Sequence, residues 1–393
     1  MFGVNEWSNI WHTRQHLGSR LAQRGWRVIY STGQPFSYQR RTKDWWARPW
    51  IAEHRVQNRV IISKPGWLRT RCERLPWWDR YVSERHAQDL MEAVGWKETR
   101  HRILYVSYPK FWPYVKYLGD SHVVYHADDA FSLMPDWTPE EESMQAHLVA
   151  RADLILASSE AIARLLPNDG PQRARLFPNA ADAVAYMKAR DEPCPEELSS
   201  IPHPRIGYTG SINLKVDLPL ITTIASQKPD WHWVLVGPLI SISVTEFPAT
   251  RAHAEALAAC RKSRNIHFVG PKSFRDVPSY MAHMDVNAMC YRHEPGGWWT
   301  AIHPLKLYEY LAVGQPVVSA DIEAVRPFSS VLAIADSAKG WIHAIMDALE
   351  TGGVGTAHSR QAVAIANTWE HRVAQLVRWI QELADHNERQ TNS

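Results

Sequence analysis

The chain has 393 residues, enough for two domains of ordinary size. Its content of 45% hydrophobic and 22% charged residues is that of a soluble globular protein. Four scattered cysteines exclude a disulfide framework and a zinc site. No signal peptide is visible, and the longest apolar-leaning segment, 231–244, is too short for a membrane span. We therefore expect a cytoplasmic protein, with a peripheral position on the inner face of the cell membrane as the alternative.

Residues 38–80 are basic and rich in tryptophan. They hold eleven Lys/Arg against four Asp/Glu, an excess of seven positive charges, and six of the nineteen tryptophans. Cations interleaved with tryptophan suit a surface that rests on anionic lipid headgroups. Single-stranded nucleic acid uses similar chemistry. The ordinary alternative is a solvated basic face whose tryptophans fold into a core.

The N-terminal half alternates strands and helices, which is typical of a parallel α/β domain. The first strand, 1–5, is short, so we expect either an upstream start of the chain or a frayed sheet edge. Ser8 is expected to cap a helix that ends near Arg24. The later strands are predicted at 26–31, 102–107, 122–127 and 153–159, and the later helices at 110–118, 138–151 and 160–166.

A change of composition divides the chain. Residues 182–204 contain four prolines among acidic residues and predict an interdomain linker. We therefore expect one domain over 1–181 and a second α/β domain over 205–360. The second domain's strands are expected in RIGYTGS, WHWVLVG, NIHFVG, DVNAMCY and PVVSA, and residues 361–393 predict a helical tail.

Residues 303–319, HPLKLYEYLAVGQPVVS, predict a short helix, a stop and a buried strand. Pro304 suits the first helical position and Gly314 the left-handed position after the helix. Lys306 and Glu309 share a face. A helix N-terminus with a lysine can hold an anion, and a glutamate one turn later can accept hydrogen bonds from sugar hydroxyls. The pair therefore suits a nucleotide diphosphate with its ribose, or else is an ordinary exposed ion pair.

From Pro304 to Ser319 the chain resembles the donor-binding segment of GT-B glycosyltransferases, particularly the group 1 (family 4-like) branch of bacterial surface-polysaccharide pathways. The shared pattern is P-x-K-x-x-E-Y-x-A-x-G-x-P-V-V-x-S. The resemblance implies a GT-B fold, with two Rossmann-like doubly wound parallel-sheet domains facing across a cleft. The first would bind the acceptor and the second the donor. A closing helix with Trp369 and Arg372 would return to the first domain. Many relatives carry a second glutamate where this chain has Ala301.

The loops at the carboxyl ends of parallel strands are where ligands bind in such sheets. The loop after RIGY offers a glycine for close phosphate approach and neutral donors, although an ordinary turn has the same composition. The loop after WHWVLVG resembles the strand end that flanks the nucleotide. The expected donor-binding residues are Gly210, Ser211, Asn213, Gly237, Pro304, Leu305, Lys306 and Glu309.

The expected catalytic residues lie in the first domain. His126 and Asp128 follow the strand HVVYHA and are suited to acid–base work or hydroxyl binding. Asp129 stands beside them, and one of the two carboxylates is expected to cap a turn. In the first loop, Glu6 or Asn5 would hold the acceptor.

The resemblance implies transfer of a sugar from a nucleotide-diphosphate donor to a hydroxyl acceptor, in cell-surface polysaccharide or glycolipid synthesis. Retention of configuration, no metal and no cofactor are expected. The expected partners are the nucleotide sugar and a saccharide or lipid-linked saccharide acceptor, with an anionic membrane touching 38–80 and no nucleic acid. Two other classes stay open: a sugar-nucleotide epimerase of the same fold, and a non-catalytic member that binds nucleotide sugar or lipid.

Overall fold

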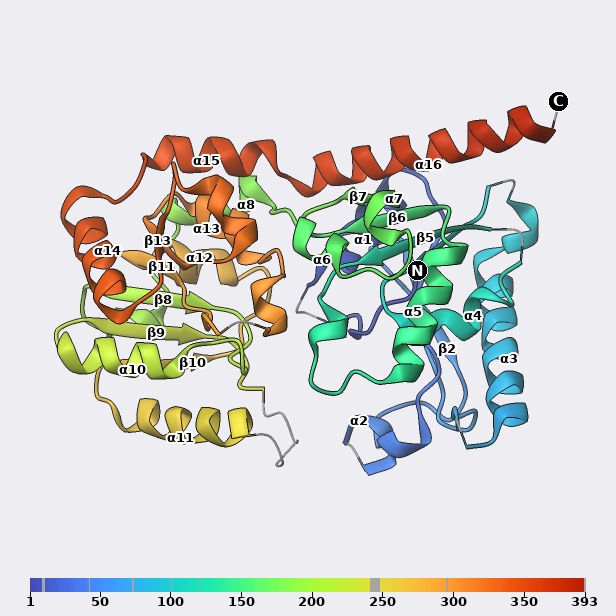
Figure 1. Cartoon of the computed structure of the whole chain (residues 1–393), viewed down its shortest axis with the longest axis horizontal. Coiled ribbons are helices and arrows are strands. Elements are labelled where there is room, and N and C mark those ends of the chain that lie inside the picture. The colour runs from blue at the N-terminus through green and yellow to red at the C-terminus, as the bar shows by residue number, and fades with distance from the viewer. Residues whose placement is uncertain are drawn as a thin grey trace. The chain divides into compact units, whose positions relative to one another are not determined.

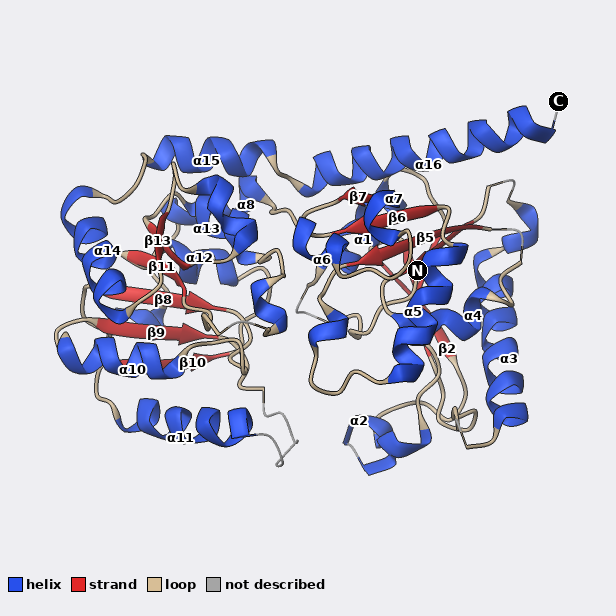
Figure 2. Ribbon diagram, in the orientation of Figure 1, coloured by secondary structure: helices blue, strands red, loops and turns tan. Residues whose placement is uncertain are grey.

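The computed structural model describes residues 1–8, 11–41, 43–72, 74–99, 101–119, 121–240, 248–294 and 296–391. The chain forms two compact units (Figure 1). Unit 1 contains Met1–Pro178 and Glu370–Ser393, and unit 2 contains Asn179–Trp369. In each unit helices surround a mostly parallel sheet (Figure 2).

The central strands of unit 1 are buried, whereas β2 is exposed. Among the described strands of this unit, only β2 runs antiparallel, beside β3 at the sheet edge. The strands are β1 (Val28–Ser31), β2 (Glu53–Gln57), β3 (Val60–Lys64), β4 (Ile103–Val106), β5 (His122–Ala127), β6 (Leu154–Ala157) and β7 (Ala174–Leu176). The α-helices are α1 (Thr13–Gln23), α2 (Lys43–Trp46), α3 (Pro76–Val94), α4 (Trp112–Val115), α5 (Pro139–Arg151), α6 (Glu160–Arg164) and α7 (Gly170–Arg173).

The first residues lie in the middle of this sheet. Phe2 bridges Ser31 of β1 on one side and Val106 of β4 on the other, both in parallel. The Phe2 N–H donates to the Tyr105 carbonyl at 2.8 Å. The order across the sheet is therefore β2, β3, β1, Phe2, β4, β5, β6, β7. The expectation of a frayed edge is wrong, because the short first strand is paired on both sides.

Unit 2 has a six-stranded, all-parallel sheet in the order β10-β9-β8-β11-β12-β13. This is the doubly wound order in which the sequence of strands reverses between β8 and β11. The strands are β8 (Arg205–Thr209), β9 (His232–Val236), β10 (Ile266–Gly270), β11 (Val286–Met289), β12 (Val317–Ala320) and β13 (Ala333–Ala335).

The helices of unit 2 fall into two groups. Helices α10 and α14 contact one another, and α10 contacts α11, whereas α8, α12, α13 and α15 contact one another. A doubly wound fold has one layer of helices on each face of its sheet, and the two groups of helices in unit 2 correspond to these two layers. The bounds are α8 (Ala183–Lys188), α9 (Glu196–Ser199), α10 (Leu218–Gln227), α11 (Pro248–Lys262), α12 (Val277–Ala282), α13 (Lys306–Val313), α14 (Ala338–Thr351) and α15 (Ala357–Ala366).

The stretch 182–204, expected as a linker, lies inside unit 2. Helices α8 and α9 form there, and Tyr186 and Leu198 on them are buried. The chain passes between the units at Pro178 and Asn179, before the prolines begin. The prolines separate short packed helices, so their density does not mark a flexible connection here.

The tail contains two helices. Helix α15 packs against α13 in unit 2. Helix α16 (Trp369–Thr391) belongs to unit 1 from Glu370 onward. There the Arg20 Nε donates to Glu370 at 2.6 Å, and the Arg372 Nε donates to the Pro178 carbonyl at 2.9 Å.

Two helix starts differ from the sequence prediction. Helix α1 begins at Thr13 with His12 as its N-cap, closed by a capping box with Gln15, so Ser8 is not the cap. Helix α13 begins at Lys306, and Pro304 lies just before its N-cap. Helix α5 begins near the expected position, with a capping box formed by Thr138 and Glu141.

Candidate functional site

The carboxyl ends of β8 and β11 lie side by side in unit 2, at the point where the strand order reverses. Backbone groups and side chains that follow these two strands therefore face the crevice that ligands occupy in such sheets. Thr209 and Gly210 follow from β8, and Tyr291 lies two residues beyond β11. The expected donor site is built around these ends.

Lys306, the first residue of α13, brings a cation to this edge. Its side chain is 6% exposed, and its Nζ lies 3.6 Å from the ring centre of Tyr208 and 5.1 Å from that of Tyr291. The Nζ has no hydrogen-bond partner in the described part of the chain. Burial, and then the neighbouring Lys215, hold the pKa of Lys306 well below 10.5. Ring π-systems attract a cation but do not replace a hydrogen-bonded anion.

Two glycines bring backbone close to this ammonium. A Cβ on Gly210 would stand 2.8 Å from the Lys306 Nζ, and a Cβ on Gly237 would stand 2.1 Å from the Gly210 carbonyl oxygen. Both residues have positive φ, at 133° and 147°. A side chain at Gly210 would push the Lys306 ammonium aside, and one at Gly237 would displace the loop after β8, so both glycines are needed for this close approach.

Glu309 lies one turn beyond Lys306 on α13 and is half-buried. Burial raises its pKa to about 7, against the lowering effects of a hydrogen bond from Tyr186 and of Lys306. The carboxylate is therefore close to half-protonated at neutral pH. Its oriented, partly desolvated oxygens can accept hydrogen bonds from hydroxyl groups.

The other expected donor residues have local structural roles. The Asn213 Oδ1 accepts from the Lys215 N–H at 3.2 Å, and the Ser211 carbonyl accepts from the Tyr208 hydroxyl at 3.1 Å. Pro304 is buried and Leu305 is the N-cap of α13. Ala301 is 5% exposed.

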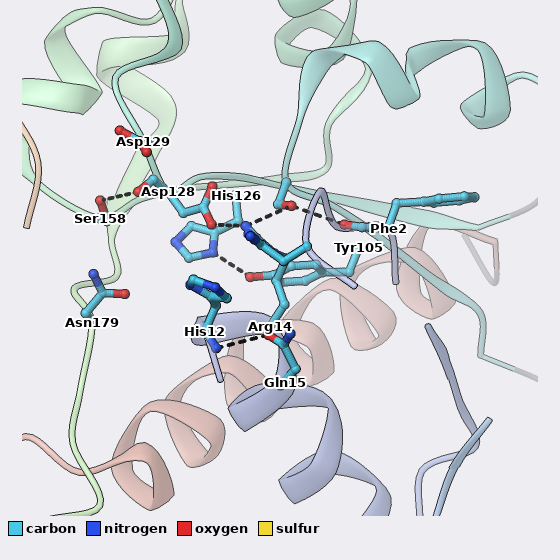
Figure 3. A network of polar contacts seen from close by, with 12 residues as sticks. Phe2, His12, Arg14, Gln15, Tyr105, His126, Asp128, Asp129, Ser158 and Asn179 are labelled. Carbon is cyan, nitrogen blue, oxygen red and sulfur yellow. Dashed lines mark hydrogen bonds and ion pairs between the residues drawn. The ribbon is translucent and has the colours of Figure 1, made fainter. Parts of the chain in front are cut away.

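A second polar cluster lies at the carboxyl ends of the central strands of unit 1. Arg14 of α1 is 5% exposed. Its Nη1 contacts the Asp128 carboxylate and donates to the Ser107 hydroxyl at 3.2 Å, while its Nη2 contacts the Asn5 amide oxygen. Figure 3 shows the guanidinium pointing at Asp128. One arginine thus joins the loops that follow Phe2, β4 and β5.

His126 is fully buried beside this cluster. Its Nδ1 bonds the Tyr105 hydroxyl at 2.5 Å (Figure 3). Its ring packs edge-on against Phe177. Burial lowers the pKa of His126 to about 4 and raises that of Tyr105 well above 10, so both are neutral at pH 7. If Tyr105 donates its O–H to Nδ1, the ring proton is on Nε2. His126 is then a hydrogen-bond donor and not a base.

The remaining expected residues of unit 1 are placed differently. Glu6 is exposed and pairs with Arg48 at 3.4 Å, so its side chain is not among the contacts that join Arg14, Asp128 and Asn5. The Asp129 Oδ1 accepts from the Ala130 N–H at 2.9 Å, which is the expected turn-capping role for one of the two carboxylates.

Sequence reasoning missed several residues of both clusters. Arg14 and Tyr105 complete the cluster of unit 1, and Tyr208, Tyr291 and Tyr186 complete that of unit 2. The sequence positions of Tyr208 and Tyr291 could have indicated them. Both lie at or near the carboxyl ends of predicted strands, next to loops in which donor-binding residues were expected. Arg14 carried no signal, because a single arginine in an amphipathic helix is ordinarily solvent-exposed.

Residues 203–351 match the family model described as "Glycosyl transferases group 1". The resemblance to the group 1 glycosyltransferases is confirmed. Over 184 residues the chain is 28% identical to a Bacillus subtilis protein, TuaH, whose name describes a glycosyltransferase of teichuronic acid biosynthesis. That match covers 46% of this chain and 43% of the relative, so the chain spans less than half of the relative's length.

Solved structures extend the likeness to the whole chain. Sucrose-phosphate synthase from Thermosynechococcus elongatus has a TM-score of 0.69 at 13% identity, covering 95% of this chain and 93% of that one. HepE from Anabaena, solved with UDP-glucose, has a TM-score of 0.67 at 15% identity, covering 97% and 99%. At this identity the likeness shows the fold, and the GT-B fold is confirmed.

The described residues hold no group of three or more His, Cys, Asp or Glu side chains suited to a metal ion. Among their helices, none combines the length and apolar character needed to cross a bilayer.

Arg14 and Asp128 form a buried pair, so a double-mutant cycle measures their coupling. We expect Arg14→Met and Asp128→Leu each to lower the free energy of unfolding by about 3–5 kcal/mol, because each leaves one buried charge unpaired. The double variant should lose less than the sum of the two. Urea unfolding of the four proteins gives the coupling, and strictly additive losses would show that the pair is not coupled.

Lys306→Met removes the buried ammonium but keeps much of the side-chain volume. We expect the ligand-free variant to be more stable than wild type by about 1 kcal/mol, equivalent to about 2–4 °C in Tm for a domain of this size. The reason is that an unpartnered buried charge is costly. Thermal unfolding measures the change, and a lower Tm in the variant would show that the rings of Tyr208 and Tyr291 fully compensate the ammonium.

The pKa values of Glu309 and Lys306 predict a bell-shaped pH dependence of nucleotide binding. Affinity should fall below about pH 7 as Glu309 becomes protonated, given its pKa of about 7. It should fall again as the pH rises through the pKa of Lys306, which burial holds well below 10.5, because the ammonium then loses its proton. Titration calorimetry across pH tests both limbs. In Glu309→Gln the acid limb should vanish and the alkaline limb remain; an unchanged acid limb would exclude Glu309 as its source.

Proposed function

We propose that this protein is a metal-independent glycosyltransferase that moves a sugar from a nucleotide-diphosphate sugar to a hydroxyl acceptor. The observation that carries the proposal is the buried Nζ of Lys306, which has no hydrogen-bond partner among the described residues and lies where the carboxyl ends of β8 and β11 meet. The GT-B fold and the group 1 family match over 203–351 support it. HepE and the trehalose-6-phosphate protein of E. coli, of the same fold, were solved with UDP-glucose and UDP-2-fluoro glucose.

In the proposed reaction the bond from the anomeric carbon to the donor phosphate breaks, and the acceptor oxygen forms a new bond to that carbon. Negative charge grows on the departing diphosphate. The ammonium of Lys306 and the backbone N–H groups at the start of α13 would stabilise it. Glu309 would accept hydrogen bonds from the ribose, and Gly210 and Gly237 would let the phosphates approach the loop after β8.

We also propose that the reaction proceeds with retention of configuration. Inversion would call for a base to deprotonate the acceptor. Of the expected catalytic residues, Asp128 is held by Arg14, His126 is buried with a low pKa, and Glu6 is exposed. These side chains are suited to orienting an acceptor rather than to deprotonating it. The acceptor is proposed to be a saccharide or lipid-linked saccharide of a cell-surface polymer.

A thermal-shift panel of UDP-, GDP-, ADP- and dTDP-sugars tests the donor site. At 100 times its dissociation constant a true donor should stabilise wild type by about 2.7 kcal/mol. The shift should vanish in Lys306→Ala and persist in Lys339→Ala, an exposed lysine of α14. A shift that survives in Lys306→Ala would exclude this lysine as the phosphate site.

Product analysis separates the proposal from its alternatives. A transferase releases free nucleoside diphosphate only when an acceptor is present. A sugar-nucleotide epimerase would convert the donor without acceptor, and a non-catalytic member would bind without turnover.

We further propose that residues 38–80 touch an anionic membrane during turnover. Trp46, Trp50 and Trp77 are 67–70% exposed, and Trp46 and Trp50 both contact the ring of Trp67. Exposed tryptophans of this kind anchor proteins at the headgroup level of a bilayer. Trp45, in contrast, is 3% exposed and belongs to the core, and the side chains of Arg41 and Lys43 lie outside the described residues.

Vesicle co-sedimentation tests this contact. We expect binding to phosphatidylserine-containing vesicles that weakens with salt and falls in a Trp46→Ser, Trp50→Ser, Trp77→Ser variant. Ile365→Ser, which removes an exposed apolar side chain from unit 2, should bind like wild type. Binding that is insensitive to charge reversal at the exposed Arg40, Arg74 and Arg80 would count against the proposal.

A further inference from the structure

Arg292 lies, like Lys306, where the strand order reverses between β8 and β11, and it follows the carboxyl end of β11. It directly follows Tyr291, whose ring lies near both Lys306 and Lys215. Its backbone N–H donates to the Lys215 carbonyl at 2.9 Å, which ties the β11 end to the loop after β8. The residue is only 8% exposed. A second strong cation is therefore held, nearly buried, at the edge where the donor is proposed to bind.

One edge of this guanidinium is empty. The Arg292 Nη1 donates to Glu294 at 3.3 Å, but Nε and Nη2 are buried without a hydrogen-bond partner in the described ranges. Nε and Nη2 form the edge that grips two oxygens of one anion. The chain shows this grip elsewhere: the same two atoms of Arg71 hold both oxygens of Asp79, at 3.0 and 2.8 Å.

The neighbours of Arg292 do not fill that edge. The Asp217 carboxylate caps α10 by accepting from the Leu220 N–H at 2.9 Å. Glu294 is largely exposed and contacts only Nη1. His253 of α11 is also buried, its Nδ1 has no partner within the described chain, and burial together with Arg292 lowers its pKa, so it is neutral. Burying the two N–H donors of Nε and Nη2 without acceptors costs free energy. A bound anion would offset that cost.

We propose that Arg292 forms a second anion-binding position in the donor site, separate from Lys306. There Arg292 binds both oxygens of an anionic group of the bound donor. This rests on the proposed function. Such a group has two chemical sources: the donor's phosphate next to the sugar, or a carboxylate on the sugar ring, as in a hexuronate. Lys306 is a point charge that can serve a phosphate by itself, whereas the flat fork of Arg292 matches two coplanar oxygens.

The test uses titration calorimetry with three probes: the free nucleoside diphosphate, its neutral hexose conjugate and its hexuronate conjugate, in the uridine and guanosine series. Wild type is compared with Arg292→Lys, which keeps the charge and loses the fork, and with Arg292→Gln. The matched control is Arg264→Lys, an exposed arginine that precedes β10 at the opposite edge of the sheet. Circular dichroism confirms that each variant is folded.

The expected result is a loss of about tenfold or more in affinity in Arg292→Lys, since the paired hydrogen bonds of the fork are lost although the charge remains. A loss confined to the hexuronate conjugate identifies a sugar carboxylate as the group gripped. An equal loss for all three probes identifies a phosphate. Arg264→Lys should bind like wild type in either case.

Wild-type affinity for every probe in Arg292→Lys and Arg292→Gln would overturn the assignment of Arg292. If Lys306→Ala abolished binding in the same experiment, the proposed function would stand without it. Absence of binding by the wild type itself, in both nucleotide series, would overturn both proposals.

Discussion

A buried ammonium without a hydrogen-bond partner among the described residues is the feature on which the proposed donor site depends. The Nζ of Lys306 is enclosed by the rings of Tyr208 and Tyr291, and Gly210 leaves just enough room beside it. Ring faces attract a cation but do not replace an anion or a hydrogen-bond acceptor. The charged form of Lys306 is therefore costly in the ligand-free protein, and in the proposed complex the donor diphosphate would offset that cost. The same logic extends to Arg292, whose unfilled fork lies one residue beyond Tyr291.

The two units share the same reversal of strand order but differ in the charges of the side chains that lie beside it. In each, the strand order reverses next to the first strand of the unit, so loops from distant parts of the chain meet at one edge. Unit 1 fills that edge with an internal ion pair, in which Arg14 neutralises Asp128 and holds Asn5. At that edge of unit 2, the Nζ of Lys306 and the Nε and Nη2 of Arg292 are buried without a hydrogen-bond partner among the described residues. A self-neutralised edge is suited to a neutral ligand such as a hydroxyl acceptor, and a cationic edge with open donors is suited to an anionic ligand.

Sequence patterns predicted the parts of the fold that depend on local periodicity. Alternating apolar strands and helices led to the doubly wound architecture, and the pattern around Lys306 and Glu309 located helix α13, whose C-terminal Gly314 has the expected positive φ of 80°. Residues that depend on packing between distant segments were not predictable. Whether Lys306 is buried depends on Tyr208, almost 100 residues away, and Arg14 pairs with Asp128 across 114 residues. Glu6 was selected by its place in a loop, yet its side chain points to Arg48.

The measurement that tests the central claim most directly is the titration of the Lys306 side chain by NMR, with ¹³C-labelled lysine, in the free protein and with a saturating nucleoside diphosphate. The pKa of Lys306 should lie well below 10.5 in the free protein. It should rise when the diphosphate binds, because the anion stabilises the charged form. The resonance is assigned by its absence in Lys306→Met. A Lys306 that titrates near 10.5 with and without nucleotide would contradict the claim that its ammonium is buried, unpartnered and reserved for the donor phosphate.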